Sequence, residues 1–406
     1  MTDAAATPID PVELTRDLIR RPSVTPADAG AMDTLERILT GLGFTCRRMA
    51  FEGPTGQGAD ARIENLYARR GAASPNLCFA GHTDVVPTGA AEGWSSDPFA
   101  AEVKDGVLYG RGAVDMKGGI AAWVAAVSRV LAEGEPEGSL SFLITGDEEG
   151  PALHGTKRVV EALMAEGEVI DACVVGEPSS QQQLGDMIKI GRRGSLNTWI
   201  TVHGKQGHVA YPDRAANPAP VLVRLLTALD AHVLDDGYEA FQPSNLEITT
   251  IDIGNPATNV IPAEAKARLN IRFNPSHAGD GLIAWLNAEA GRVQAETGLQ
   301  ISLDHMCSGE AFLTPVGPFV TAVQDAVEAE TGRRPEASTT GGTSDARFIR
   351  AMAPVLELGL VGQTMHQFDE RVPTAELEAL TRFYERVIRS VLSCPPQAQL
   401  GEGDHA

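Results

Sequence analysis

One short stretch restricts the possible folds of this chain more than any other. The largely apolar segment 141–145 ends at a glycine and is followed by three consecutive acids, Asp147, Glu148 and Glu149. Adjacent carboxylates repel one another, so a fold keeps them at a strand end only where solvent, cations or a proton-transfer task stabilises them. An isolated acidic triplet is most often a solvated turn. The rest of the sequence decides between these two interpretations.

Three other apolar runs of the chain are also followed by polar side chains that could bind a metal ion. The runs are 76–80 before His82 and Asp84, 172–175 before Glu177, and 354–360 before His366. Open α/β sheets bind their ligands at the carboxyl ends of the strands. We therefore expect these side chains to meet at one edge of a sheet, and the acidic triplet to belong to a site there.

The composition argues against two classes of partner. The chain has 33 basic and 54 acidic side chains, a net charge of −21 at pH 7, which disfavours nucleic acids and anionic membranes. No run reaches the roughly 20 apolar residues of a membrane span, and the first residues lack the basic and apolar parts of a signal peptide. The five scattered cysteines show no Cys-x-x-Cys pattern and are typical of reduced thiols. We expect a cytoplasmic protein with no nucleic-acid or membrane partner.

The order of the predicted elements indicates two domains, as the length of 406 residues also suggests. Strand and helix patterns alternate in residues 1–193 and 308–395, which predicts an α/β domain with a mostly parallel sheet and helices on both faces. Residues 194–307 follow the order β-α-β-β-α-β of a ferredoxin-like α+β fold. We expect this inserted part to be a dimerisation or lid domain, because its sheet leaves a face and edges to cover. Residues 396–406 are expected to form a disordered tail.

The residues at the predicted strand ends match the needs of a dinuclear metal site. Two zinc-like cations about 3.5–4 Å apart require a bridging carboxylate, a carboxylate or histidine on each side, and an open position for water. The predicted ligands are His82 and Glu177 for one ion, Glu149 and His366 for the other, and Asp115 as the bridge. A single histidine or acid would more often be structural. Their joint placement at strand and helix ends favours a metal site.

Two further acids beside these ligands are predicted to act in catalysis. Asp84 lies two residues after His82, where its carboxylate can accept the second ring N–H of that histidine and fix its tautomer. Glu148 is adjacent to the predicted ligand Glu149 without being needed as a ligand itself. A general base that removes a proton from water belongs at such a position.

The same residues carry a resemblance to a known family over nearly the whole chain. The sequence is similar to the di-zinc aminoacylase/carboxypeptidase superfamily of metallopeptidases at Gly81-His82-Thr-Asp84-Val-Val-Pro, Gly110-Arg-Gly-Ala-Val-Asp115, Gly146-Asp-Glu148-Glu149, Gly176-Glu177-Pro-Ser and His366. More specific segments resemble the family of succinyl-diaminopimelate desuccinylases. These are Gly185-Asp-Met-Ile-Lys-Ile-Gly-Arg192-Arg193-Gly-Ser195, Gln206-Gly-His208-Val-Ala-Tyr-Pro, Asn259-Val-Ile-Pro and Gly341-Gly-Thr343-Ser-Asp345.

This resemblance implies a metal-dependent amide hydrolase that cleaves the small molecule N-succinyl-LL-2,6-diaminopimelate to succinate and LL-2,6-diaminopimelate, on the route to lysine. It implies two divalent metal ions per subunit, zinc or alternatively cobalt. It also implies a homodimer formed through the inserted domain, and a cis peptide bond between Asp115 and Met116.

The resemblance also gives roles to residues that their own patterns leave as ordinary surface groups. It implies that His208 reaches the active site of the partner subunit and stabilises the oxyanion there, with help from Asn259, which also binds substrate. The other implied substrate-binding residues are Arg192, Ser195, Arg272 and Thr343. Without the resemblance, Arg192 is part of a solvated charge pair, and His208 is a polar loop residue.

Two alternatives stay open on the sequence alone. Acetylornithine deacetylase or another N-acyl-amino-acid hydrolase would share the metal ligands and differ in the cations of its cleft. A non-catalytic, metal-bound binding dimer would also share the ligands, but it would have no use for Glu148 beside them.

Overall fold

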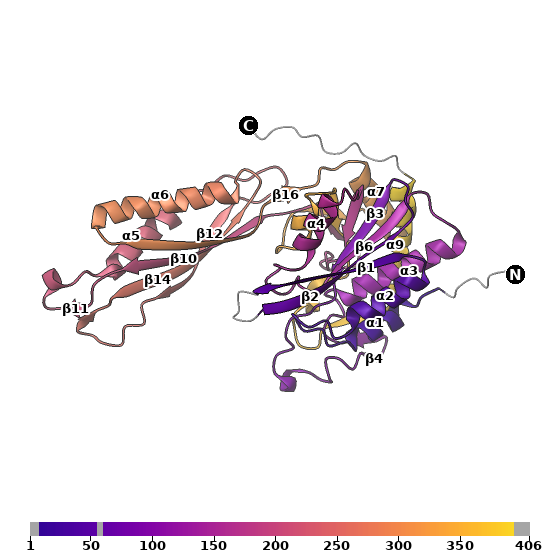
Figure 1. The fold of residues 1–406 in the computed structure, drawn as a ribbon, viewed down its shortest axis with the longest axis horizontal. Helices are drawn as coiled ribbons and strands as arrows, with labels where there is room; N and C mark the ends of the chain where they lie inside the picture. Colours follow the sequence, from indigo (N-terminus) through magenta and orange to yellow (C-terminus); the bar gives the residue numbers. More distant parts are fainter. Residues whose placement is uncertain (1–7, 55–59, 394–406) are drawn as a thin grey trace. The chain divides into compact units, whose positions relative to one another are not determined.

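The computed structural model describes residues 8–54 and 60–393, which form two compact units (Figure 1). Unit 1 contains the described residues up to Ile190, Thr314–Ser338, and those from Ser344 onward. Unit 2 contains Gly191–Leu313 and Thr339–Thr343. No sequence pattern indicated that the short segment Thr339–Thr343 belongs with the inserted part. The expected tail, 396–406, lies outside the described residues.

Eight strands of the described part of unit 1 form its main sheet, in the order β1-β2-β6-β3-β7-β18-β8-β17. Their bounds are β1 Thr45–Pro54, β2 Asp60–Arg70, β3 Asn76–His82, β6 Ser139–Thr145, β7 Ala172–Val175, β8 Met187–Lys189, β17 Glu336–Ser338 and β18 Val355–Glu357. The neighbours β6, β3, β7 and β18 run parallel to one another. Every residue of β3 and of β6 is buried, as expected for parallel strands that are covered on both faces. The carboxyl ends of these four strands therefore lie at one edge of the sheet.

Helices cover both faces of this sheet. Their bounds are α1 Pro11–Ile19, α2 Ala31–Gly41, α3 Lys117–Glu133, α4 Thr156–Ala165, α7 Pro318–Thr331, α8 Ala346–Ile349 and α9 Thr374–Leu392. On one face, α3 and α9 pack against β3, where Trp123 stacks on Phe79 with ring centroids 4.8 Å apart and meets Tyr384 edge-on at 4.9 Å. Burial of each of these rings stabilises the fold by about 1.5–3 kcal/mol. On the other face, α4 packs against β6. The predicted fold class is confirmed.

A second sheet of unit 1 aligns two loops that carry predicted ligands. It has the order β19-β5-β4, with bounds β4 Glu102–Lys104, β5 Val107–Tyr109 and β19 Arg371–Pro373. The segment with Asp115 follows β5. The segment with His366 lies between the 3-10 helix η3, Gly362–Thr364, and β19. Because Arg371 pairs with Tyr109, these two segments leave the sheet side by side.

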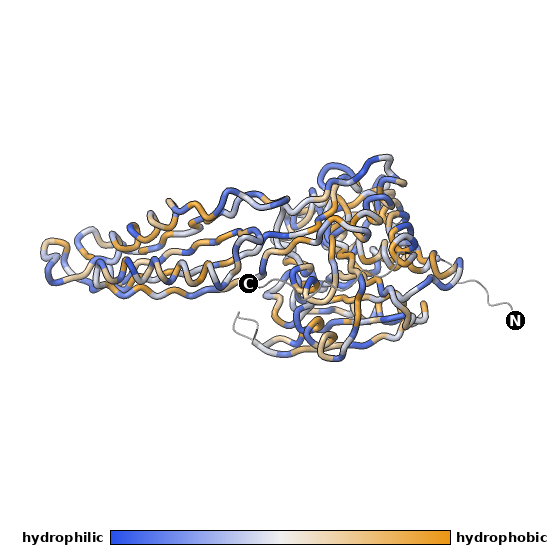
Figure 2. Tube along the Cα trace, turned by 90° about the horizontal axis from the view of Figure 1, so that it is seen from above, coloured by the Kyte–Doolittle hydropathy of each residue, from blue (hydrophilic) through white to orange (hydrophobic). Residues whose placement is uncertain are grey.

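Unit 2 contains a four-stranded antiparallel sheet in the order β12-β14-β10-β15. The bounds are β10 Gly194–His203, α5 Pro218–Asp230, β12 Asn245–Asp252, β14 Glu264–Phe273, α6 Gly279–Thr297 and β15 Ile301–Gly309. Burial alternates along β14, and its buried residues share one core with α5 and α6. Figure 2 shows hydrophilic and hydrophobic residues interspersed along the chain. Chain order, strand order and helices on one face are those of the predicted ferredoxin-like fold.

Two short strand pairs lie at opposite ends of unit 2 (Figure 1). The pair β9 and β16 stands where the chain enters and leaves the unit, at Gly191–Arg192 and Phe312–Leu313. The pair β11 and β13, Gly207–His208 and Val260–Ile261, lies beyond the far end of β10. The remaining 3-10 helices of the described residues are η1 Ala91–Gly93 in unit 1 and η2 Pro212–Arg214 in unit 2.

Candidate metal centre

Three of the predicted ligands are delivered by parallel strands of unit 1. His82 is the last residue of β3, Glu149 lies four residues beyond the end of β6, and Glu177 lies two residues beyond the end of β7. Strand β3 pairs in parallel with both β6 and β7, so the three strands end at the same edge. The strand pairing therefore brings these three side chains together, as the sequence predicted.

Asp115 and His366 reach the same place from loops. Asp115 lies two residues before α3, and its peptide bond to Met116 is cis, as the resemblance implied. The first turn of α3 lies close to the loop after β7, since a Cβ on Gly119 would stand 2.6 Å from the carbonyl oxygen of Gly176. Only glycine allows this approach. His366 follows η3 with a left-handed backbone conformation, at a φ of 61°.

The five predicted ligands form two groups that share Asp115. His82 Nε2 lies 3.2 Å from Asp115 Oδ1 and 3.6 Å from Glu177 Oε1. His366 Nε2 lies 3.3 Å from Asp115 Oδ2 and 2.8 Å from Glu149 Oε1. Within each group, the potential ligand atoms lie within 4.8 Å of one another. One oxygen of Asp115 faces each group, which is the arrangement that a carboxylate bridging two ions requires.

Asp84 supports this cluster, but its contact with His82 differs from the predicted one. The His82 Nδ1 atom lies 2.8 Å from the backbone carbonyl oxygen of Asp84 and 3.7 Å from its carboxylate. The carbonyl oxygen thus accepts the ring N–H and fixes the tautomer that turns the lone pair of Nε2 toward Asp115. The carboxylate of Asp84 instead accepts the backbone N–H groups of Glu148, at 3.2 Å, and Glu149, at 3.0 Å. It therefore orients the acidic pair.

The cluster holds more negative charge than its own donors balance. Burial raises the pKa of Glu177 and of Glu148 well above the usual value, and neighbouring carboxylates add to the effect on both. Burial likewise raises the pKa of Asp84 to about 7. Hydrogen bonding to Asp115 raises the pKa of His366 to about 10. Divalent cations stabilise carboxylates that are crowded in this way, and zinc prefers a mixed set of imidazole nitrogens and carboxylate oxygens. The residues present therefore fit such ions.

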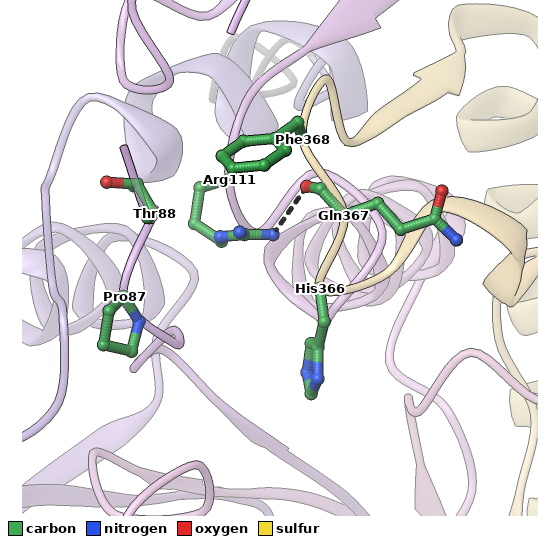
Figure 3. Close-up of a pocket in the computed structure, with 7 residues that line it drawn as sticks. Pro87, Thr88, Arg111, His366, Gln367 and Phe368 are labelled. Carbon is green, nitrogen blue, oxygen red and sulfur yellow. Dashed lines mark hydrogen bonds between the residues drawn. The ribbon is translucent and has the colours of Figure 1, made fainter. Parts of the chain in front are cut away.

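A pocket of about 530 Å³ opens beside His366 within unit 1 (Figure 3). Its lining residues are Pro87, Thr88, Gly89, Arg111, His366, Gln367 and Phe368. Arg111 Nη1 donates to the backbone carbonyl oxygen of Gln367 at 3.2 Å, which connects the two walls. The pocket leaves room for a small molecule next to the second ligand group.

Three of the predicted substrate-binding residues, Arg192, Ser195 and Arg272, lie near the start of β10 in unit 2, and Thr343 ends the short segment of that unit that begins at Thr339. Arg192 Nη1 donates at 2.8 Å to the backbone carbonyl oxygen of Thr340, three residues before Thr343. Ser195 and Arg272 are directly opposite each other on β10 and β14. Guanidinium groups and hydroxyls gathered in one place are suited to the recognition of carboxylates.

His208 and Asn259 lie at the other end of unit 2. The backbone N–H of Val209 donates to the carbonyl oxygen of Asn259 at 3.0 Å, and both His208 and Asn259 are exposed. Strand β10 separates them from the first group, and its eight steps from Ser195 to His203 span about 26 Å. One copy of unit 2 therefore does not place both groups around the same small ligand.

Two charged residues that contact the Asp115 segment have no predicted role. Arg111 and Glu370 form an ion pair with Nη1 2.8 Å from Oε2, and their side chains are 3% and 0% exposed. Arg111 stands between two glycines, and Glu370 stands in the charged run Asp369-Glu370-Arg371. Many solvated residues share such patterns. The sequence therefore carries no signal that separates them from surface charges.

Comparisons with known proteins agree with this geometry. Residues 78–390 match the family model of peptidase family M20/M25/M40. Over 383 residues the chain is 66% identical to the succinyl-diaminopimelate desuccinylase of Caulobacter vibrioides, which covers 94% of this chain and 96% of that relative.

Solved structures show the same fold at low sequence identity. An M20 family metallo-carboxypeptidase from Sulfolobus solfataricus superposes with a TM-score of 0.76 at 16% identity, over 94% of this chain and 99% of that one. A dinuclear metal-binding peptidase of the M20 family from Bacillus subtilis superposes with a TM-score of 0.68 at 16% identity, over 94% and 97%. Among the described residues, no helix combines the length and apolar composition needed to cross a membrane. The family model spans most of the chain and the curated relative spans nearly all of it, so the chain belongs to peptidase family M20/M25/M40.

Proposed function

We propose that this protein hydrolyses the amide bond of N-succinyl-LL-2,6-diaminopimelate, releasing succinate and LL-2,6-diaminopimelate for lysine biosynthesis in the cytoplasm. As a member of its family, the chain is a metal-dependent amide hydrolase. One observation carries the proposal, namely the two ligand groups that share Asp115, with Glu148 beside them. The 66% identity to a succinyl-diaminopimelate desuccinylase supports the choice of substrate.

The five ligands would hold two divalent cations. His82 and Glu177 would hold one, Glu149 and His366 the other, and Asp115 would contact both. Zinc suits this set of nitrogen and oxygen donors, and cobalt is the alternative. When bound, such ions polarise the amide carbonyl and make a water molecule acidic enough to lose a proton near neutral pH.

Glu148 carries out the proton transfers in this proposal. It is adjacent to Glu149 and stands outside the two groups that share Asp115, although its carboxylate forms a third potential ligand group with His82 and Glu149. The proposal assigns it to proton transfer because the other five residues already supply ligands to both ions. Its carboxylate accepts a proton from the attacking water and then delivers it to the amine nitrogen as the C–N bond breaks. The hydrogen bond from the backbone N–H of Glu148 to Asp84 holds this base in place.

Recognition of the substrate carboxylates falls to the group near the start of β10. Arg192 and Arg272 offer planar guanidinium groups that bind carboxylates through paired hydrogen bonds. Ser195 and Thr343 add hydroxyl donors. The chain has a net charge of −21, but it can bind this dianionic substrate because the guanidinium groups of Arg192 and Arg272 supply positive charge where the substrate carboxylates bind.

The separation of the two groups in unit 2 supports a homodimer. The length of β10, about 26 Å from Ser195 to His203, separates His208 and Asn259 from Ser195 and its neighbours. They act on substrate held at the first group only if a second subunit supplies them. In the proposed dimer, formed through unit 2, His208 of one subunit stabilises the oxyanion in the site of the other, and Asn259 helps to hold the substrate.

A paired-substrate assay with a metal count tests this function. We expect the purified protein to carry two divalent ions per subunit and to prefer N-succinyl-LL-2,6-diaminopimelate over N-acetylornithine by about 10²-fold or more in kcat/KM, because only the former pairs a succinyl carboxylate with the cleft arginines. Removing the metal with a chelator should abolish activity, and adding zinc or cobalt should restore it. Preference for N-acetylornithine, or substrate binding without product, would contradict the proposal.

A further inference from the structure

We infer that Glu370 is a positioning residue for the metal centre, because it fixes the segment that carries Asp115 against the loop that carries His366. Glu370 belongs to neither ligand group. The inference rests on the proposed function, since it concerns residues that are proposed to bind metal.

The carboxylate of Glu370 holds the Asp115 segment through three donors. Its Oε1 atom accepts the backbone N–H of Val114 at 2.9 Å and that of Asp115 at 3.1 Å. Its Oε2 atom accepts Nη1 of Arg111 at 2.8 Å. A single side chain thus fixes the main chain at the residue that faces both ligand groups.

The same residue also holds the loop of His366. The side chain of His366 is 48% exposed, so packing alone does not fix its position. Glu370 lies four residues later, and its backbone carbonyl oxygen accepts the N–H of Gly110 at 2.9 Å. Arg111, the partner of Glu370, also donates to the carbonyl oxygen of Gln367. Glu370, in the loop of His366, therefore binds the Asp115 segment, and Arg111, beside that segment, binds the loop of His366.

Burial makes this junction stiff. The Glu370 and Arg111 side chains are almost completely removed from solvent, where hydrogen bonds are stronger and an unpaired charge is costly. An ion pair that only stabilised the fold could lie anywhere in unit 1. Here, two of the hydrogen bonds come from the backbone N–H groups of Asp115 and its neighbour Val114. The loss of contacts that hold a metal-binding residue in place typically lowers metal affinity or activity by about 10- to 100-fold.

Replacing Glu370 with glutamine tests the inference through metal affinity. In Glu370→Gln, the amide keeps one oxygen for the N–H groups of Val114 and Asp115, but it turns N–H donors toward Arg111. We expect the zinc-loaded, full-length variant to bind zinc about tenfold more weakly than wild type, measured by competition with a chromophoric chelator. Excess zinc should restore much of the lost turnover. Glu370→Ala removes both acceptor oxygens, and with them all three hydrogen bonds, and should weaken zinc binding further.

A matched variant separates positioning from general stability. Glu330 accepts hydrogen bonds from Arg382 and Arg386 between α7 and α9, and its side chain is 16% exposed. Glu330→Gln should lower the melting temperature and leave the zinc affinity unchanged.

The two Gln variants together decide the outcome. The inference is overturned if Glu370→Gln binds zinc as tightly as wild type, or if Glu330→Gln loses zinc to the same extent. If Glu370→Ala does not fold, the Gln variant decides the question. Failure of the proposed function would look different, because the wild-type protein itself would then hold no zinc or release no succinate.

Discussion

Asp235 in unit 2 and Glu177 in unit 1 are equally removed from solvent, with side chains 11% and 12% exposed, but they have different neighbours. Asp235 accepts hydrogen bonds from Ser244, Gly237 and Asn274. Burial alone would raise its pKa, yet these donors lower it to about 2. Glu177 is surrounded by other carboxylates, and burial raises its pKa well above the usual value.

This difference separates structural acids from those that are proposed to bind metal or to transfer protons. An acid that is saturated with donors, as Asp235 is, has a complete set of partners within the protein and stabilises a local turn. Acids that crowd together with few donors, such as Glu148 and Glu177, are stable as a group only when cations share the space. Glu370 lies beside the candidate metal centre, and burial raises its pKa, but it accepts three hydrogen bonds and in this respect resembles Asp235. Its surroundings are the reason for assigning it to positioning.

The largest expected effect concerns the donor-poor acids of unit 1. Glu148→Gln should lower kcat by about 10² or more, because the amide accepts no proton from water, while the metal content stays that of wild type. Steady-state kinetics and metal analysis measure the two quantities. Glu161→Gln, at a half-exposed position on α4, is the control and should turn over normally. Normal turnover in Glu148→Gln would show that Glu148 is not the general base. It would also contradict the distinction drawn between donor-poor and donor-rich acids.

An intermediate effect is expected from unit 2. His208→Ala should bind metal normally and lose most of its turnover, because the oxyanion loses a donor. If His208 acts in the neighbouring subunit, refolding an equal mixture of His208→Ala and Glu148→Gln should recover about a quarter of wild-type activity, since half of the dimers are mixed and each has one intact site. Recovery of no activity, with mixed dimers present, would place His208 in the site of its own subunit.

The smallest expected effect concerns the donor-rich acid of unit 2. The pKa of Asp235 is lowered on folding, so its stabilising effect is fully present above its ordinary pKa near 3.8 and is lost as the pH falls toward about 2. Asp235→Asn should therefore lower the melting temperature at pH 6, and the difference from wild type should shrink below pH 4. Thermal unfolding across this range measures it, with Asp236→Asn, at an exposed neighbouring position, as the control. A difference that is the same at every pH would mean that the charge of Asp235 is not what stabilises the turn.

The sequence by itself determined the main helices and strands, and the strand ends that polar side chains follow. Apolar runs that stop before His82, Glu149 and Glu177 predicted both the strands and the edge where these residues meet, because parallel strands present their carboxyl ends together. The alternating pattern of β10 and β14 predicted the ferredoxin-like fold of unit 2 in the same local way. These features depend on short-range periodicity, which a single sequence records directly.

The tertiary structure alone decided which atoms meet across long stretches of chain. Only the structure shows that the backbone carbonyl of Asp84, and not its carboxylate, accepts from His82. The bonds of Glu370 to Val114 and Asp115 join residues more than 250 positions apart. The choice between carbonyl and carboxylate, or between a solvated and a buried charge, depends on how packed segments exclude water from one another. That exclusion is a property of the assembled chain and leaves no periodic trace in the sequence.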